Sequence, residues 1–434
     1  MRKLLLTSLL MFATVTCAGC SFTFNYFVPA YPGDTSGGGG GGDSENEFTM
    51  DDSGTYDIKI WCDQRIRDLT QTQVQQFVTD SGGNYKINLT IDELGEDSAA
   101  SQMTEDVQSG ADIFVFAQDQ LSKLKTAGAL AAVTGDTLLN NVKNETEEGG
   151  VEAASLNGKM YAFPFTGDNG YFMYYNKKVV KEESVGDIEK IIADCEAQSK
   201  TINYSIFGNG FYAASYFMAT GCSSTWDINS NNKFYQYHDN YNSDAGVIAG
   251  KGISYLKQHN IFGNSDDPSK FTKNLGVCVS GIWNYGYAYD AIGEDLGCAP
   301  MPSFTVDGKK YHISSFSGYK LIGVKPQTDA KKVSVCKRIA RYLSKQQCQT
   351  ERFNIVGWGP TNKAVLNLDA VKNHPGLKAL REQKPYSKPQ VQCPSSWFSS
   401  VSSLANSIMP NATEGDIRAA LASYEANLES FLGD

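Results

Sequence analysis

Between Tyr56 and Gly128 the chain alternates three times between a strand pattern and a helix pattern, and this order restricts the fold more than any other feature. Apolar side chains occupy alternate positions in residues 56–60 and 85–89, and residues 111–116 are almost continuously apolar. Apolar residues at helical spacing follow each of these segments. Strands that alternate with helices form a parallel sheet covered on both faces. We therefore expect an α/β fold with a mainly parallel sheet.

The carboxyl ends of the strands in such a sheet form the rim where ligands bind. The residues that the pattern places at this rim are Trp61, Asp63, Phe116 and Asp119.

A second unit of the same type follows in the chain. Residues 171–175 and 277–282 have strand patterns, and the second of these ends at Trp283. A helix is expected over residues 244–259, with Ser243 as its N-cap. A chain of 434 residues is long enough for two or three such units.

The N-terminus has the layout of an export signal. Arg2 and Lys3 precede an apolar run, residues 4–15, that is too short to span a bilayer. The run ends at Cys17-Ala18-Gly19-Cys20, which resembles a bacterial lipobox. We expect residues 1–19 to be a lipoprotein signal peptide and Cys20 to carry the lipid; an ordinary secretory cleavage nearby is the alternative.

Residues 20–54 contain a run of six glycines and many acids, so they cannot bury a core and are expected to form a flexible tether. The whole chain has 48 acidic and 38 basic residues, a net charge of −10, which disfavours nucleic acid as a partner.

Signals for catalysis are absent from the sequence. The four histidines are isolated, and there is no G-x-S-x-G elbow, P-loop or metal-ligand spacing. We therefore expect no enzyme activity, no cofactor and no metal. Eight cysteines follow Cys20 without a C-x-x-C pair, which leaves open whether they form disulfides.

Aromatic residues stand beside polar residues at several predicted strand ends, as at Trp61, Phe116, Trp283 and within 395–399. A sugar ring has an apolar face and a belt of hydroxyls, so it binds flat aromatic rings with carboxylate or amide groups at their edges. Any one of these residues fits a core equally well, but their recurrence favours a carbohydrate cleft.

Five further motifs carry a resemblance to a known family. They are residues 110–119 with 128–130 behind them, 157–164 leading to 174–177, 281–283, 299–302 and 357–361. From about Tyr56 to Phe431 the chain resembles the extracellular solute-binding proteins of bacterial ABC importers, specifically the maltose/maltodextrin-binding branch (family 1).

The resemblance implies two α/β lobes, each a mainly parallel sheet flanked by helices, with the ligand in the hinge cleft. The first lobe would hold residues 55–165 and 315–362, and the second residues 166–314 and 363–434.

The resemblance also implies a set of ligand-binding residues. Trp283 and Trp397 match sugar-stacking tryptophans of the second lobe, Phe116 matches a stacking tryptophan of the first, and Phe211 matches a stacking tyrosine. Hydroxyl-binding residues of the family are matched by Asp119 and Asp168, and Asp63 and Arg65 lie near the polar contacts of the first strand. Phe for Trp at 116, Gln120 where the family often has Arg, and Asp for Glu at 168 leave a different oligosaccharide open.

The resemblance thus implies a lipid-anchored, monomeric receptor on the outer face of the cytoplasmic membrane, or in the periplasm if the host has an outer membrane. It would capture a short oligosaccharide, for which an α-glucan is the favoured candidate, and deliver it to the membrane permease of an ABC importer. A receptor for a non-sugar solute, a secreted glycoside hydrolase and a surface adhesin are the alternatives.

Overall fold

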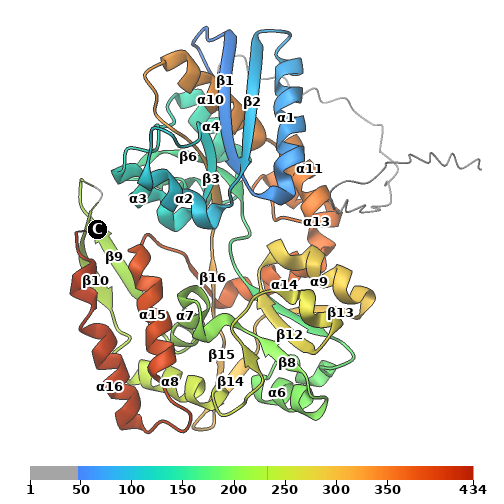
Figure 1. Ribbon diagram of the computed structural model, residues 1–434, viewed down its shortest axis with the longest axis vertical. Helices are drawn as coiled ribbons and strands as arrows, with labels where there is room; N and C mark the ends of the chain where they lie inside the picture. Colours follow the sequence, from blue (N-terminus) through green and yellow to red (C-terminus); the bar gives the residue numbers. More distant parts are fainter. Residues whose placement is uncertain (1–46, 232, 434) are drawn as a thin grey trace, which may run out of the picture. The chain divides into compact units, whose positions relative to one another are not determined.

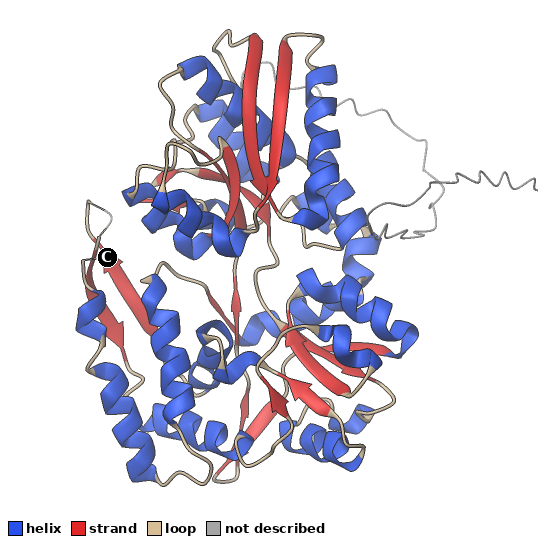
Figure 2. Cartoon of the chain, viewed as in Figure 1, coloured by secondary structure: helices blue, strands red, loops and turns tan. Residues whose placement is uncertain are grey.

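The computed structural model describes residues 47–231 and 233–433, and these residues form two five-stranded sheets with helices around them (Figures 1 and 2). The predicted signal peptide, Cys20 and most of the predicted tether lie outside the described residues. In the described ranges, no helix combines the length and the apolar composition needed to cross a membrane.

The first sheet has the strand order β2-β1-β3-β17-β6. Its strands are β1 (Gly54–Cys62), β2 (Tyr85–Glu93), β3 (Ile113–Ala117), β6 (Ala162–Thr166) and β17 (Lys320–Val324). β1 runs parallel to β2 and β3, whereas β17 is antiparallel to both of its neighbours. One strand thus runs against the other four, which confirms the mainly parallel sheet.

The second sheet repeats this plan with the order β11-β8-β12-β7-β13. Its strands are β7 (Phe172–Asn176), β8 (Thr201–Asn203), β11 (Phe262–Gly263), β12 (Leu275–Ser280) and β13 (Leu296–Ala299). Here β7 is the strand that runs against its neighbours. The two-lobe α/β architecture predicted from the sequence is therefore confirmed.

Helices pack against both sheets. The helices that lie in the chain between β1 and β6, or directly after β17, are α1 (Arg67–Asp80), α2 (Glu96–Glu105), α3 (Leu121–Thr126), α4 (Asp136–Glu145), α5 (Gly150–Ala153), α10 (Ala330–Leu343) and α11 (Gln346–Val356). Those that follow β7 or end the chain are α6 (Ile188–Ala197), α7 (Gly210–Ala219), α8 (Asp244–Leu256), α9 (Tyr285–Ile292), α12 (Lys363–Leu366), α13 (Asp369–Asn373), α14 (Pro375–Gln383), α15 (Ser395–Ser407) and α16 (Glu414–Glu425).

Short paired strands complete the described fold. They are β4 (Ser155–Leu156) with β5 (Lys159–Met160), β9 (Ser224–Ile228) with β10 (Phe234–Asp239), β14 (Ser303–Val306) with β15 (Lys309–His312), and β16 (Ser315–Ser317) with β18 (Ser387–Pro389).

The chain passes between the two sheets three times, and we call these stretches the crossing segments. Residues 167–171 connect β6 to β7, and residues 315–319 lead back into β17. Residues 357–374 lead from α11 to α14, which contacts β7 and β13. Any change in the relation of the two sheets must involve these segments.

Several local expectations are confirmed and others are corrected. Ser243 is the N-cap of α8, because its hydroxyl accepts from the amide of Gly246. Trp61 is not at the rim, since β1 continues to Cys62 and the indole N–H reaches Asp92. All eight cysteines after Cys20 are free thiols, which settles the open disulfide question for the described residues.

Candidate functional site

A cavity of about 440 Å³ collects polar side chains around one tryptophan, and we call it the tryptophan cleft. Its lining comes from the first sheet's side (Asp63, Gln64, Arg65, Glu93, Gly95) and from the second sheet's side (Asp266, Trp283, Asn284, Tyr287). A ligand in this cleft would therefore contact both lobes.

Asp63 and Arg65 lie in this cleft because β1 ends directly before them. Asp63 caps the short 3₁₀ helix Gln64–Ile66 by accepting from the amide of Arg65. The Arg65 side chain bonds the same carboxylate through Nε at 2.8 Å. Burial by itself raises the pKa of Asp63, but the hydrogen bonds and charge of Arg65 outweigh it and hold that pKa below its usual value. Asp63 is therefore an ionised acceptor at neutral pH.

Trp283 reaches the cleft from the turn that follows β12. Its ring folds back over Gly281, where a Cβ atom would stand 2.0 Å from the ring, so only glycine fits at that position. The ring is half-buried, and its main-chain carbonyl accepts a hydrogen bond from Arg65. A flat apolar face is thus fixed beside a charged pair.

A buried lysine, Lys320, packs against the ring of Trp283 and helps to hold it in place. The ammonium of Lys320 lies 5.2 Å from the ring centroid of Trp283 and 4.6 Å from that of Trp358, within cation–π range of both. It also forms an ion pair with Glu96. Arg65 lies over the other tryptophan, with its guanidinium carbon 5.2 Å from the Trp358 ring. The two cations and two indoles form one packed cluster.

Acceptors line the far wall of the cleft. The Asp266 carboxylate accepts from the hydroxyl of Tyr212 at 2.9 Å. Asn284 donates both amide hydrogens, to the Asp266 carbonyl and to the hydroxyl of Ser280, which fixes the orientation of its side chain. Tyr287 is exposed at the edge of the cleft. Carboxylates and an oriented amide beside an indole face are the groups that hydroxyl-rich ligands require.

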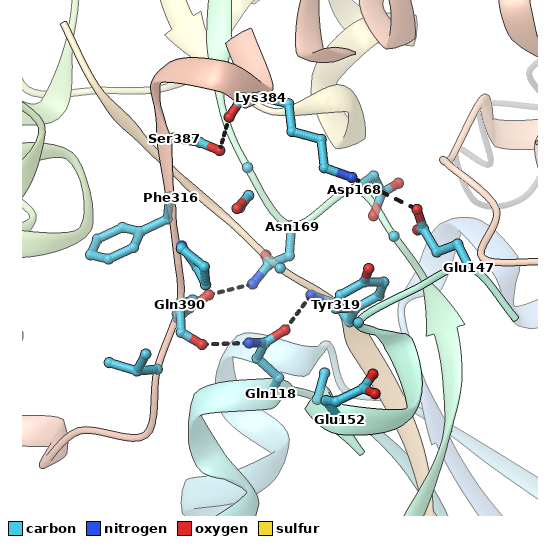
Figure 3. Close-up of a pocket in the computed structure, with 18 of the residues that line it drawn as sticks. Gln118, Glu147, Glu152, Asp168, Asn169, Phe316, Tyr319, Lys384, Ser387 and Gln390 are labelled. Atoms are coloured by element: carbon cyan, nitrogen blue, oxygen red, sulfur yellow. Dashed lines mark hydrogen bonds and ion pairs between the residues drawn. The ribbon is translucent and has the colours of Figure 1, made fainter. Parts of the chain in front are cut away.

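A second and larger cavity, of about 1260 Å³, lies on the crossing segments, and we call it the hinge cavity (Figure 3). All three crossing segments contribute to its lining, including Asp168 of the first. The Asp168 carboxylate accepts from the Thr166 hydroxyl and from the amide of Gly359, each at 2.6 Å. It is buried, and burial raises its pKa. Asp168 thus ties the first crossing segment to the third.

The structure brings together three of the eight ligand-binding residues expected from the sequence. Asp63, Arg65 and Trp283 share the tryptophan cleft, and Asp168 lines the hinge cavity. The remaining four line neither cavity, and they are Phe116, Asp119, Phe211 and Trp397.

Those four residues have other surroundings. Phe116 is fully buried in the first sheet and packs against Phe114. Trp397 is buried, with its indole N–H bonded to the hydroxyl of Tyr424 at 2.8 Å. Phe211 is half-buried and stacks on Phe316 with centroids 5.2 Å apart.

Asp119 is buried in the turn after β3, and burial raises its pKa to about 6 although its neighbour Gln120 donates a hydrogen bond to it. One of its carboxylate oxygens has no partner among the described residues. Asp119 therefore takes up a proton at a higher pH than an exposed aspartate does.

Sequence reasoning missed Lys320, Glu96 and Trp358. Trp358 belongs to the motif 357–361, so its place in a family motif was a usable signal. Lys320 gave none, because a lysine that opens an apolar strand reads as a surface residue. Only the tertiary structure shows that it is 1% exposed between two indoles.

Two α/β lobes joined by three crossing segments, with an aromatic and polar cleft lined from both, define a protein that binds a solute between its lobes. The chain belongs to the bacterial extracellular solute-binding protein family, whose model matches residues 72–379.

Two characterised relatives are similar over most of the chain. A maltotriose-binding protein of Pyrococcus abyssi is 24% identical over 74% of this chain and 70% of its own length. A galactooligosaccharide-binding protein of Bacillus subtilis is 22% identical over 66% of this chain and 68% of its own length.

Solved structures match the fold closely. The maltodextrin-binding protein MalE1 of L. casei BL23 has a TM-score of 0.70 at 19% identity, covering 87% of this chain and 98% of that one. A maltotriose-binding protein of Thermus thermophilus has a TM-score of 0.69 at 17% identity, covering 86% of this chain and all of that one. At this identity the likeness concerns the fold.

Proposed function

We propose that this protein captures short oligosaccharides, with α-glucans of the maltodextrin type first, as the substrate-binding protein of an ABC importer. The observation that carries the proposal is the tryptophan cleft, where the face of Trp283 stands beside the carboxylates of Asp63, Glu93 and Asp266. The names of the two characterised relatives point to the same ligand class.

In this proposal the sugar stacks on Trp283 and its hydroxyls bond the surrounding acceptors. Asp63 accepts from a hydroxyl with the charge that Arg65 stabilises, and charge-assisted bonds of this kind are stronger than neutral ones. Because the cleft is lined from both lobes, the bound sugar stabilises one relation between them. A permease can then recognise the sugar-bound protein by this arrangement of its lobes.

The proposal includes delivery to a membrane permease and a lipid anchor at Cys20, with the mature monomer held at the outer face of the cytoplasmic membrane. Residues 1–46 lie outside the described structure, so the sequence pattern around Cys20 is the support for the anchor. Retention by a lipid suits a receptor that must remain near its permease. No catalytic role is proposed.

Titration calorimetry with maltotriose and with a β-linked galactotriose tests the ligand class. Binding of maltotriose supports the hypothesis of an α-glucan ligand. Binding of galactotriose alone would indicate a different oligosaccharide as the ligand. Silence with both sugars, together with clear binding of an amino acid or a metal ion, would overturn it. Reducing-sugar release measured in the same samples would instead indicate a hydrolase.

A further inference from the structure

The hinge cavity is separate from the tryptophan cleft in its lining and in its chemistry. An amide network closes one part of it, where Gln118 donates to the carbonyl of Gln390 and accepts from the amide of Tyr319 at 2.7 Å (Figure 3). Asn169 donates to the side chain of Gln390 at 2.6 Å. These polar groups already have partners, so a ligand must find its contacts elsewhere in the cavity.

One wall of the cavity is acidic. Glu147, Glu148 and Glu152 all line it, and all three carboxylates act electrostatically on the hydroxyl of Tyr319. Lys384 approaches Glu147 at 3.9 Å, but its side chain is largely exposed. No ion pair in the described part of the chain involves Glu148 or Glu152. Lys372 and Arg381 also line the cavity, but its five acidic residues, which include Asp168 and Asp227, outnumber its three basic residues, so the lining keeps an excess of negative charge that favours a cation.

Two buried polar groups in the lining have no hydrogen-bond partner within the described ranges. They are the hydroxyl of Ser315, a fully buried residue, and the indole N–H of Trp226, which is 7% exposed. A buried polar group without a partner destabilises the folded state, so such groups are rare. Because both residues line the cavity, a ligand in it is the nearest source of a partner for these groups.

The rest of the lining sets the shape of the ligand. Apolar side chains from both lobes contribute to it, among them Leu156, Leu366, Val371, Leu377, Leu380 and Val391. The rings of Phe316 and Tyr319 add aromatic surface that attracts a cation. A hydroxyl-rich sugar would leave this surface poorly satisfied, whereas an apolar body would cover it.

We propose that the hinge cavity is a second binding site, which takes a small organic cation with an apolar body. The ammonium group lies against Glu148 and Glu152, and the apolar body packs on the leucines. A polar atom on that body bonds the hydroxyl of Ser315. The site is independent of the oligosaccharide cleft and does not depend on the proposed function.

Calorimetry with three probes of the same shape tests this proposal: phenylbutylamine, phenylbutanol and phenylbutyrate. Because an exposed carboxylate contributes up to about 1 kcal/mol, a factor of about five, the amine should bind about fivefold more tightly than the alcohol, and the acid should bind most weakly. In Glu148→Gln/Glu152→Gln this preference for the amine should disappear. Glu183→Gln removes an exposed acid elsewhere and should leave it unchanged.

Equal affinity for amine and alcohol in the wild-type protein, or no binding of the amine up to its solubility limit, would overturn the proposal. So would a preference that survives in the double variant. Ser315→Ala gives a second readout, with phenylbutanol as the probe. Since the hydroxyl has no partner to lose, the melting temperature should stay the same or rise, while the affinity for phenylbutanol should fall. A lower melting temperature with unchanged affinity would show that Ser315 is structural and remove it from the site.

Discussion

The guanidinium of Arg65 donates a hydrogen bond to the main-chain carbonyl of Trp283, which lies 218 positions further along the chain. Arg65 follows the first strand of the first sheet, and Trp283 follows β12 of the second. The bond therefore joins the lobes at the tryptophan cleft. Because its acceptor is a backbone atom, substitution of Trp283 leaves the bond available and only a change at Arg65 removes it.

Arg65→Lys is expected to weaken oligosaccharide binding by roughly tenfold, since lysine keeps the charge but cannot bond Asp63 and the Trp283 carbonyl together. Titration calorimetry measures the affinity. Arg67→Lys, two residues away and more exposed, is the matched control and should bind normally. Equal losses in both variants would contradict a specific role for Arg65.

Trp283→Ala should mainly lower the affinity for sugar, whereas Trp397→Ala should mainly lower the stability of the fold. Removing the half-buried Trp283 ring should cost about 2 kcal/mol of binding, a loss of about 30-fold, with a small change in melting temperature. Removing the buried Trp397 ring also removes the bond to Tyr424, so the free energy of unfolding should fall by about 3–5 kcal/mol. Thermal unfolding without ligand and calorimetry with maltotriose separate the two. A folded Trp397→Ala that has lost affinity would place that residue in the site.

Glu147 predicts a specific dependence of stability on pH. Burial raises its pKa from 4.5 to about 7, despite the opposing charge of Lys384. The folded state therefore favours the protonated acid, so the protein loses stability as the pH rises from about 4.5 to about 7, by roughly 1–3 kcal/mol. Glu147→Gln lacks this loss and should be more stable than the wild type at pH 8 but equal to it at pH 4. Denaturant unfolding at both pH values measures the difference, and a constant difference would refute the raised pKa.

Cys20→Ala should release the protein from membranes into the surrounding medium or periplasm. The prediction follows from acylation of that cysteine, and cell fractionation with immunoblotting measures it. Cys17→Ala keeps the lipid-bearing cysteine and serves as the control. Retention of Cys20→Ala in the membrane fraction would show that another feature holds the protein there.

The architecture was predictable because it depends on local periodicity. Alternating strands and amphipathic helices in residues 56–128 predict a parallel sheet, and the structure confirms it. The antiparallel strands were not visible in this way, because β17 and β7 join their sheets through pairings distant in sequence. Periodicity shows where a strand occurs in the chain, but it does not show which strand lies next to it in the sheet.

The site was less accessible to sequence reasoning. Asp63 could be placed because it directly follows a strand, and Trp283 because a strand leads to it. Phe116 was expected at the rim, yet its side chain points into the core, since alternation along a strand does not say which face is buried. Lys320 could not be found from the sequence, because it supports the cleft only through its packing between Trp283 and Trp358.

The position of β17 has a consequence for how the chain reaches its folded state. β17 lies between β3 and β6, but the chain supplies it only at Lys320, after all the strands of the second sheet. The first sheet therefore cannot close from its own contiguous segment, and its slow, non-local pairing must wait until all the strands of the second sheet have been synthesised. A chain that ends before Lys320 would leave β6 without a partner in the sheet and one edge of β3 open, and such edges pair readily with other molecules. Truncation at this point should yield aggregates in place of a soluble half.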